Sequence, residues 1–131
     1  MTVVDDDVFK KLELLEKQAA DFGFAWPNEN TIIKQVLSEC EEIQQELRQD
    51  PLSVSNKRKL QEEIGDLLHA AFSLCVFCGF GTKETLTNSI NKFEQRFGAV
   101  KQLAAKSDLV DLNGLPFARL MEFWDQAKTK G

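Results

Sequence analysis

Residues 39–66 are ECEEIQQELRQDPLSVSNKRKLQEEIGD, a stretch that predicts two helices joined by a short turn. Glu39 and Glu42 fall on the first predicted helix, and Glu63 and Asp66 fall on the second. At about 100° per residue, both acidic pairs lie wholly or partly on stripes that are otherwise apolar. The two stripes consist of Ile32, Val36, Glu39, Ile43 and Leu47, and of Glu63, Asp66, Leu67, Ala70, Leu74 and Phe77.

Carboxylates on apolar helix faces indicate a bound cation. An unpaired buried carboxylate is costly, so such a group is protonated, paired with a cation or bound to a metal. Side chains three residues apart can reach one ion from the same side of a helix, and carboxylate oxygens suit a hard cation such as Mg²⁺. The alternative is that the acids simply lie on solvated helices. Two pairs on an antiparallel hairpin leave both interpretations open.

The composition is that of an ordinary globular domain. The chain has 131 residues, of which 43% are hydrophobic and 28% are charged, and this length predicts a single domain over residues 1–131. The formal charge of -5 argues against a nucleic-acid polymer as partner, because such binding needs clustered cations. The chain can still bind a small anionic substrate if a metal ion neutralises the charge of that substrate locally.

The ends and the cysteines bear on where the protein is located. The N-terminal segment MTVVDDDVFK lacks the basic segment and apolar core of a signal peptide. The longest apolar run, Ala70–Phe80, is shorter than a bilayer requires, which predicts no membrane partner. Three cysteines give no even disulfide framework and favour a reducing compartment. We therefore expect a cytoplasmic protein.

The periodicity predicts helices throughout and no strand, so the expected fold class is all-α. The predicted helices run from about 5 to 22, 28 to 49, 55 to 79, 82 to 106 and 116 to 128. Asn28 or Asn30 is expected to cap the second helix, and Ser55 or Asn56 the third. The first helix is expected to place its polar residues largely on one side, namely Lys10, Lys11, Glu16 and Lys17. The apolar side of the fourth is expected to contain Leu86, Ile90, Phe93, Phe97, Val100 and Leu103 or Ala104.

Basic residues gather at two places. Lys57, Arg58 and Lys59 crowd the predicted start of the third helix, where the helix dipole disfavours cations. A bound phosphate would relieve that conflict, whereas the alternative is a solvated basic run. Lys92 and Arg96 lie one turn apart on the fourth helix and can hold a phosphate together or form an exposed basic patch.

Two single residues also have competing interpretations. Trp26, in a loop that contains Gly23 and Pro27, is either an anchor over the core or a flat surface for a ligand base, and the pattern alone favours the anchor. His69 is the only histidine and lies three residues after Asp66. A partly exposed or supporting position is favoured over a di-iron ligand, because one chain has a single histidine and the metal would need a symmetric dimer.

Five segments match, in order and spacing, those of a known family. They are GFAWP at 23–27, Glu39-x-x-Glu42, EEIGDLL at 62–68, NKFEQRF at 91–97 and WDQAK at 124–128. Each is weak alone, but their combination is specific. From about residue 22 to 128 the chain resembles the MazG-like nucleoside triphosphate pyrophosphohydrolases.

The resemblance implies hydrolysis of a nucleoside triphosphate to the monophosphate and pyrophosphate, with Mg²⁺ as cofactor and Mn²⁺ as its substitute. It implies that the catalytic and metal-binding residues are Glu39, Glu42, Glu63 and Asp66. The substrate-binding candidates are Lys59, Lys92, Arg96, Trp124, Lys128 and Trp26. It further implies a helical bundle with a four-helix core that assembles as a homodimer or homotetramer.

One departure from the family pattern bears on activity. The family's E-E-x-x-E begins here with Ser38, whose hydroxyl can order a water but cannot act as a carboxylate base. Glu41 and Glu46 are nearby substitutes, and a metal can itself lower the pKa of a bound water. Two alternatives stay open: a dimeric dUTPase-like or dCTPase-like nucleotide hydrolase with a narrower substrate set, and a non-catalytic helical interaction module with a metal-binding acidic groove.

Overall fold

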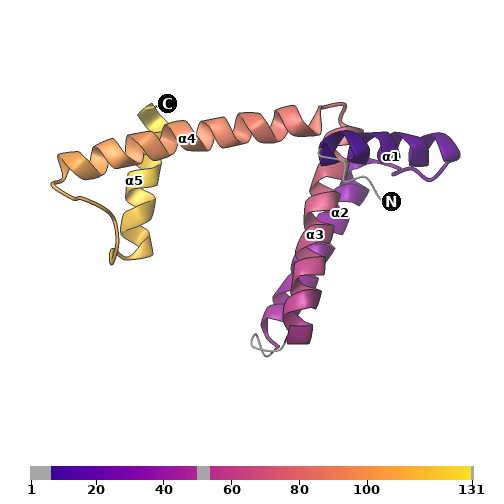
Figure 1. The fold of residues 1–131 in the computed structure, drawn as a ribbon, viewed down its shortest axis with the longest axis horizontal. Coiled ribbons are helices and arrows are strands. Elements are labelled where there is room, and N and C mark those ends of the chain that lie inside the picture. The colour runs from indigo at the N-terminus through magenta and orange to yellow at the C-terminus, as the bar shows by residue number, and fades with distance from the viewer. Residues whose placement is uncertain (1–6, 50–53, 131) are drawn as a thin grey trace. The chain divides into compact units, whose positions relative to one another are not determined.

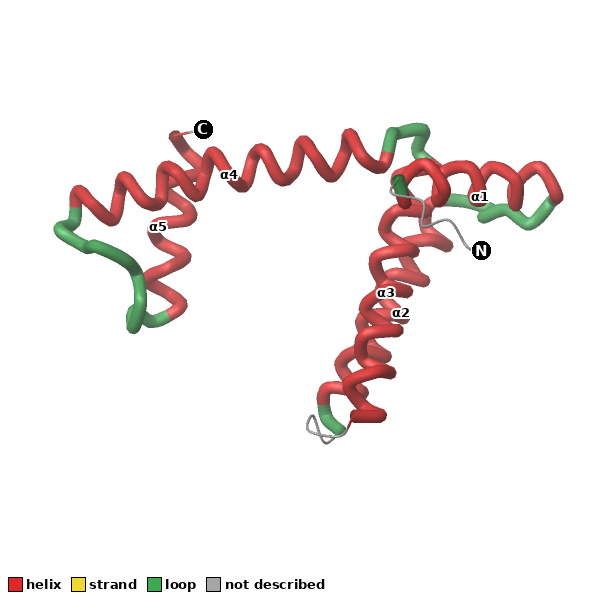
Figure 2. Tube along the Cα trace, in the orientation of Figure 1, coloured by secondary structure: helices red, strands yellow, loops and turns green. Residues whose placement is uncertain are grey.

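The computed structural model describes residues 7–49 and 54–130, which contain five α-helices and no strand (Figures 1 and 2). The helices are α1 (Val8–Phe22), α2 (Glu29–Leu47), α3 (Val54–Phe77), α4 (Thr82–Lys106) and α5 (Phe117–Lys130). The predicted all-α class is therefore confirmed. Tertiary contacts divide the chain into two units, Met1–Thr85 and Leu86–Gly131. The single domain, the four-helix core and the oligomer stay predictions.

The helix starts follow local capping chemistry. Asp7 caps α1, since its side chain accepts a hydrogen bond from the Lys10 N–H, and Asn28 caps α2 by accepting one from the Thr31 N–H at 2.9 Å. The predicted cap of the third helix at Ser55 or Asn56 is wrong, because α3 already begins at Val54. The first N–H groups of a helix need a partner from the preceding residues, which here lie outside the described part of the chain.

The first unit is built on an antiparallel hairpin of α2 and α3, which lie side by side in Figure 1. Ile32 on α2 and Ala70 on α3 are buried, as the two apolar stripes predict. Both stripes are wrong at their ends, where Leu47 and Phe77 are exposed. Each is the last residue of its helix, so the chain turns away before a partner can cover it.

Helix α1 is joined to the hairpin mainly by polar contacts and one aromatic pair. The rings of Phe9 and Phe72 meet edge to face with centroids 5.6 Å apart. Glu13 Oε1 accepts hydrogen bonds from the N–H of Thr82 at 2.8 Å and from its hydroxyl at 2.9 Å. Thr82 is fully buried and begins α4. Glu13 therefore satisfies the start of a helix far from it in sequence.

The stability contributed by Glu13 is expected to depend on pH. The hydrogen bonds from Thr82, first from its N–H and then from its hydroxyl, lower the pKa of Glu13 below its ordinary value of 4.5. This contribution is present above that ordinary value and is lost as the pH falls through the lowered one. Thermal denaturation between pH 6 and 3 should show a steeper loss of Tm for the wild type than for Glu13→Ala. Parallel curves for the two proteins would contradict this expectation.

The break between α3 and α4 is formed by a glycine. Gly79 has φ 84°, and the next N–H, of Phe80, donates to the Cys75 carbonyl at 3.0 Å, which ends α3 as predicted. Helix α4 then begins at Thr82, also as predicted. Among the described residues no single helix has the length and apolar character to cross a membrane; α3 and α4 meet those criteria only as a broken pair, on length and composition alone.

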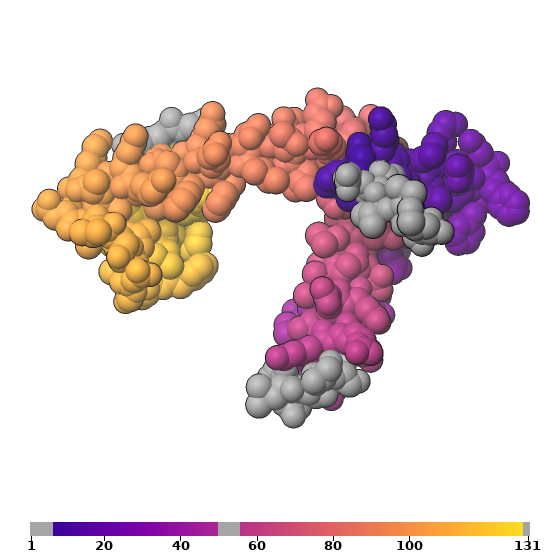
Figure 3. Space-filling view, in the orientation of Figure 1, coloured from indigo at the N-terminus to yellow at the C-terminus, as the bar shows by residue number. Residues whose placement is uncertain are grey.

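The second unit consists of α5 packed beside the C-terminal half of α4 (Figure 3). Its core is Val100, Phe123 and Ala127. The loop between the helices covers this core with Leu109, Leu112 and Leu115. The predicted apolar side of α4 is buried only near its end, whereas Ile90, Phe93 and Phe97 are 55%, 58% and 48% exposed. This stripe of large apolar side chains is uncovered in the single chain.

Candidate active site

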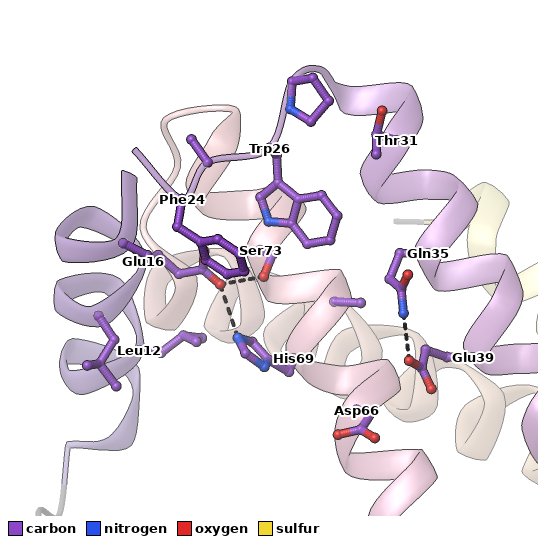
Figure 4. A pocket seen from close by; sticks show the side chains of 15 residues that line it. Leu12, Glu16, Phe24, Trp26, Thr31, Gln35, Glu39, Asp66, His69 and Ser73 are labelled. Atoms are coloured by element: carbon purple, nitrogen blue, oxygen red, sulfur yellow. Dashed lines mark hydrogen bonds and ion pairs between the residues drawn. The ribbon is translucent and has the colours of Figure 1, made fainter. Parts of the chain in front are cut away.

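A cavity of about 700 Å³ lies among α1, α2, α3 and the loop between α1 and α2, within the first unit (Figure 4). This volume is in the range of small-molecule sites. Its apolar lining comes from Leu12, Leu15, Ala19, Phe24, Ala25, Trp26, Pro27 and Ala70. Its polar lining comes from Glu16, Thr31, Gln35, Glu39, Asp66, His69 and Ser73.

Glu39 on α2 is a buried acid in this cavity, only 7% exposed. The Gln35 amide donates to Glu39 Oε1 at 2.8 Å, one turn earlier on the helix. Glu39 Oε2 is also buried and accepts no hydrogen bond within the described residues. Burial raises the pKa of Glu39; the Gln35 hydrogen bond opposes this, and the negative charges of Glu42 and Asp66 raise the pKa further.

Glu63 on α3, like Glu39, has one unsatisfied carboxylate oxygen. Its Oε2 is buried and has no hydrogen-bond partner in the described part of the chain. Two unsatisfied carboxylate oxygens on the two arms of one hairpin are unfavourable unless a cation or a proton compensates them. Hard carboxylate oxygens fit Mg²⁺, which typically binds one or two carboxylates and completes its shell with water and substrate phosphates. As they stand, no three acidic, histidine or cysteine side chains among residues 7–49 and 54–130 are grouped to hold a metal ion.

The other two predicted acids are more open. Asp66 is exposed and lines the cavity. Glu42 is exposed and does not line it, although its charge affects Glu39. The structure thus brings Glu39 and Asp66 to one cavity and leaves the convergence of all four acids a prediction.

Trp26 and Lys59 differ in their relation to the cavity. Trp26 is half-buried and lines it, and its role as a substrate-binding residue stays a prediction. Lys59 does not line it, and its Nζ lies 3.4 Å from Glu46 Oε2. The Glu46 side chain is buried and requires a counter-charge, which Lys59 provides. Glu46 is thereby engaged two turns beyond Glu39 on α2.

The remaining substrate-binding candidates gather in the second unit. The Arg96 guanidinium lies 5.7 Å from the centroid of the Trp124 ring, in cation–π geometry. The Phe93 ring is 5.8 Å from Trp124 on the same side of α4. Lys92 and Lys128 are exposed and lie one turn from Arg96 and Trp124 respectively. These residues form an aromatic and basic group, and the predicted contact of Lys92 and Arg96 with phosphate stays a prediction.

The sequence-based prediction missed the polar wall of the cavity. Glu16 was expected on the polar side of α1, but it lies on the cavity with Leu12, Leu15 and Ala19. Its Oε1 accepts a hydrogen bond from Ser73 Oγ at 2.5 Å and lies 3.0 Å from His69 Nε2. The signal was present, because Glu16 falls four residues after Leu12 and three before Ala19 on one helical stripe.

His69 is partly exposed, as predicted. Its side chain is 62% exposed while it pairs with Glu16, whose side chain is 17% exposed. A carboxylate can only accept hydrogen bonds, so the imidazole Nε2 is the donor in this contact. His69 therefore supports Glu16.

The chain was compared with proteins of known type. Residues 28–100 match the model of the MazG nucleotide pyrophosphohydrolase domain, which is more than half of the chain. The chain is 31% identical over 118 residues to the nucleoside triphosphate pyrophosphohydrolase of Escherichia coli strain K12, which covers 90% of this chain and 43% of that protein. It is 31% identical over 114 residues to the nucleoside triphosphate pyrophosphohydrolase/pyrophosphatase MazG of Thermotoga maritima, which covers 87% of this chain and 41% of that protein. The chain thus spans less than half the length of these relatives.

The matched region begins at the residue that caps α2, contains the whole α2–α3 hairpin with Glu39, Glu42, Glu63 and Asp66, and extends into the core of the second unit. The elements that carry the candidate site are therefore the elements that carry the similarity. This chain belongs to the MazG nucleotide pyrophosphohydrolase domain family.

Proposed function

We propose that this chain hydrolyses nucleoside triphosphates to monophosphate and pyrophosphate with Mg²⁺ as cofactor. The observation that carries the proposal is the pair of buried, unpartnered oxygens, Glu39 Oε2 and Glu63 Oε2, on the two arms of the hairpin. Glu39 belongs to a cavity that also contains the indole of Trp26. An anionic, oxygen-rich end beside an aromatic surface is what a magnesium nucleotide requires.

Different residues of this chain would bind the metal, position a metal ligand and contact the nucleobase. Glu39 and Glu63, with Glu42 and Asp66 next to them, would hold Mg²⁺. The ion, when bound, neutralises phosphate charge and makes a bound water more acidic. Gln35 orients Glu39 through its 2.8 Å hydrogen bond. Trp26 would offer a flat face to the nucleobase, and the apolar lining would exclude water once a nucleotide is bound.

Cations from this chain would stabilise the charge that develops on the leaving pyrophosphate. Arg96 is the strongest candidate, because its cation–π contact with Trp124 fixes the guanidinium plane. Lys92 and Lys128 lie beside it, and Lys59 would act only after leaving Glu46. Their contact with the phosphates is part of the proposal.

An oligomer is part of the same proposal. Ile90, Phe93 and Phe97 are spaced to form one stripe along α4, and all three are about half exposed. An apolar stripe of this kind is unfavourable in water and is suited to cover by a second copy. A homodimer or homotetramer would bury it. A cytoplasmic location, where nucleotides are abundant, completes the proposal.

The test is an assay of pyrophosphate release from common and modified nucleoside triphosphates, and of phosphate release from the diphosphates, with and without Mg²⁺. We expect release from triphosphates that depends on the metal, and Mn²⁺ should replace Mg²⁺. Turnover of a single deoxyuridine or deoxycytidine nucleotide would favour the narrower dUTPase-like or dCTPase-like hydrolase. A rise in Tm with Mg²⁺ without turnover of any nucleotide would refute the proposal and indicate a non-catalytic module.

A further inference from the structure

The end of the cavity opposite Glu39 carries a carboxylate that the proposed reaction does not use. In Figure 4, Glu16, His69 and Ser73 lie on one side, Gln35 and Glu39 lie on the other, and the Trp26 indole lies between them. The side chain of Glu16 comes from α1, while His69 and Ser73 come from α3. Two helices thus fix one acidic group across the cavity from Glu39.

The two oxygens of Glu16 are in different situations. Oε1 accepts the hydroxyl hydrogen of Ser73 at 2.5 Å and lies 3.0 Å from His69 Nε2. A carboxylate oxygen has two acceptor directions, so these two donors satisfy Oε1. Oε2 makes no hydrogen bond to any residue between 7 and 49 or between 54 and 130. The carboxylate is therefore held by one oxygen and has acceptor capacity left on the other.

A fixed carboxylate discriminates between nucleobases by their hydrogen-bonding groups. An exocyclic amino group donates, and a charge-assisted bond to a carboxylate is stronger than a neutral one. An exocyclic carbonyl at the same place only accepts, so it would meet Glu16 with two acceptors facing each other and no hydrogen between them. Cytosine and uracil, or adenine and hypoxanthine, differ in this way at the exocyclic position, and they also differ at the adjacent ring nitrogen, which accepts in the first base of each pair and donates in the second.

We infer that Glu16, positioned by Ser73 and His69, is a specificity-determining residue that selects nucleoside triphosphates whose base carries an exocyclic amino group. The inference rests on the proposed function, since it assumes that the phosphates lie toward Glu39 and the base lies toward Glu16. The 17% exposure of the Glu16 side chain supports it, because a desolvated carboxylate discriminates more strongly than one in water. Phe24 and Trp26 supply apolar surface for the base on the same cavity.

The test compares substrates that differ in the exocyclic group. GTP and ITP share the ring N1–H and therefore differ in the amino group alone. We would measure kcat/KM for pyrophosphate release from dCTP against dUTP, ATP against ITP and GTP against ITP, in the wild type and in Glu16→Gln. A hydrogen bond to a charged group corresponds to a preference of roughly 10- to 100-fold. We expect this preference for the amino-bearing base in at least one pair. In Glu16→Gln it should fall to within about threefold of unity, because the glutamine amide can donate to a carbonyl as well as accept.

The matched control is Asp21→Asn, which removes a carboxylate from the exposed face of the same helix, where it pairs with Lys17. Its substrate ratios should equal those of the wild type. A loss of folded protein lowers kcat/KM equally for both substrates of a pair. The ratio of the two values therefore reports on specificity even if a variant is partly unfolded. Substrate ratios near unity in the wild type, or ratios that Glu16→Gln leaves unchanged, would overturn the inference.

The failure of the proposed function would look different. If no triphosphate releases pyrophosphate with Mg²⁺, the catalytic proposal fails on its own. Calorimetry of dCMP and dUMP binding then still tests base selection by Glu16, since binding of a monophosphate requires no turnover. Tighter binding of dCMP that Glu16→Gln abolishes would support the role of Glu16, and equal binding of the two nucleotides would refute it.

Discussion

Glu39→Gln is expected to reduce magnesium-dependent pyrophosphate release by at least about 100-fold and, at the same time, to make the metal-free protein more stable at pH 8. Loss of a group that merely supports a metal ligand costs about 10- to 100-fold, so loss of a ligand itself should cost no less. The stability gain follows because glutamine removes a buried negative charge that has no cation beside it.

The pH dependence of that stability gain has a definite sign. Burial raises the pKa of Glu39 above its ordinary value of 4.5. The folded protein therefore favours the protonated acid, and this contribution is lost as the pH rises through the raised value. Melting curves without metal should show Glu39→Gln above the wild type at pH 8 and no longer so at pH 4. Added Mg²⁺ should raise the Tm of the wild type and leave that of the variant unchanged.

Glu29→Gln is the control for this prediction. Glu29 lies in the first turn of α2 and is exposed, so the substitution changes the net charge equally without touching the cavity. It should leave both turnover and the metal-dependent shift in Tm as they are in the wild type. Intact magnesium-dependent release by Glu39→Gln would show that the site assignment is wrong.

Ile90→Glu is expected to convert the protein to monomers and to reduce turnover by at least about tenfold. Ile90 is 55% exposed on α4 in line with Phe93 and Phe97. A glutamate buried in an interface between copies would lack a partner, and a central interface residue typically contributes about 2 kcal/mol, or roughly 30-fold in the dissociation constant. Light scattering should give a mass near the 14.9 kDa of one chain for the variant and a multiple of it for the wild type.

The matched substitution for Ile90→Glu is Val110→Glu. Val110 is fully exposed in the loop between α4 and α5. The substitution Val110→Glu therefore introduces the same negative charge as Ile90→Glu, but outside the apolar stripe of α4. It should retain the wild-type mass and activity. Circular dichroism must show equal helix content for both variants. A wild type that is already monomeric would rule out the proposed assembly.

Most of the fold could be predicted from local sequence signals. The Asn28 cap, the Gly79 stop and the start at Thr82 are each formed by one residue with a fixed backbone role, so the sequence shows them directly. The start of α3 could not be predicted in this way. Two good capping residues, Ser55 and Asn56, lie within the helix, because the helix begins one residue before the first of them.

The candidate site was only partly predictable, for a physical reason. Helical periodicity shows which residues share a face of one helix, and it found Glu39 as an acid on a buried stripe. It does not show which faces of different helices meet, so the contacts of Glu16 with Ser73 and of Lys59 with Glu46 were missed. In α1, as in α2, the available signal was an acid within an apolar stripe, namely Glu16 in α1 and Glu39 in α2.

Helix α1 has no fully buried residue, and it contacts α3 and the start of α4 through Glu13, Glu16 and the Phe9 ring. Its attachment therefore depends on two charges more than on a hydrophobic core. Segments held in this way open locally at a lower free energy than the rest of a domain. Recognition of the base and local opening of the N-terminal segment would thus both depend on carboxylates of one helix, so loss of the Glu13 contact with Thr82 should affect both together.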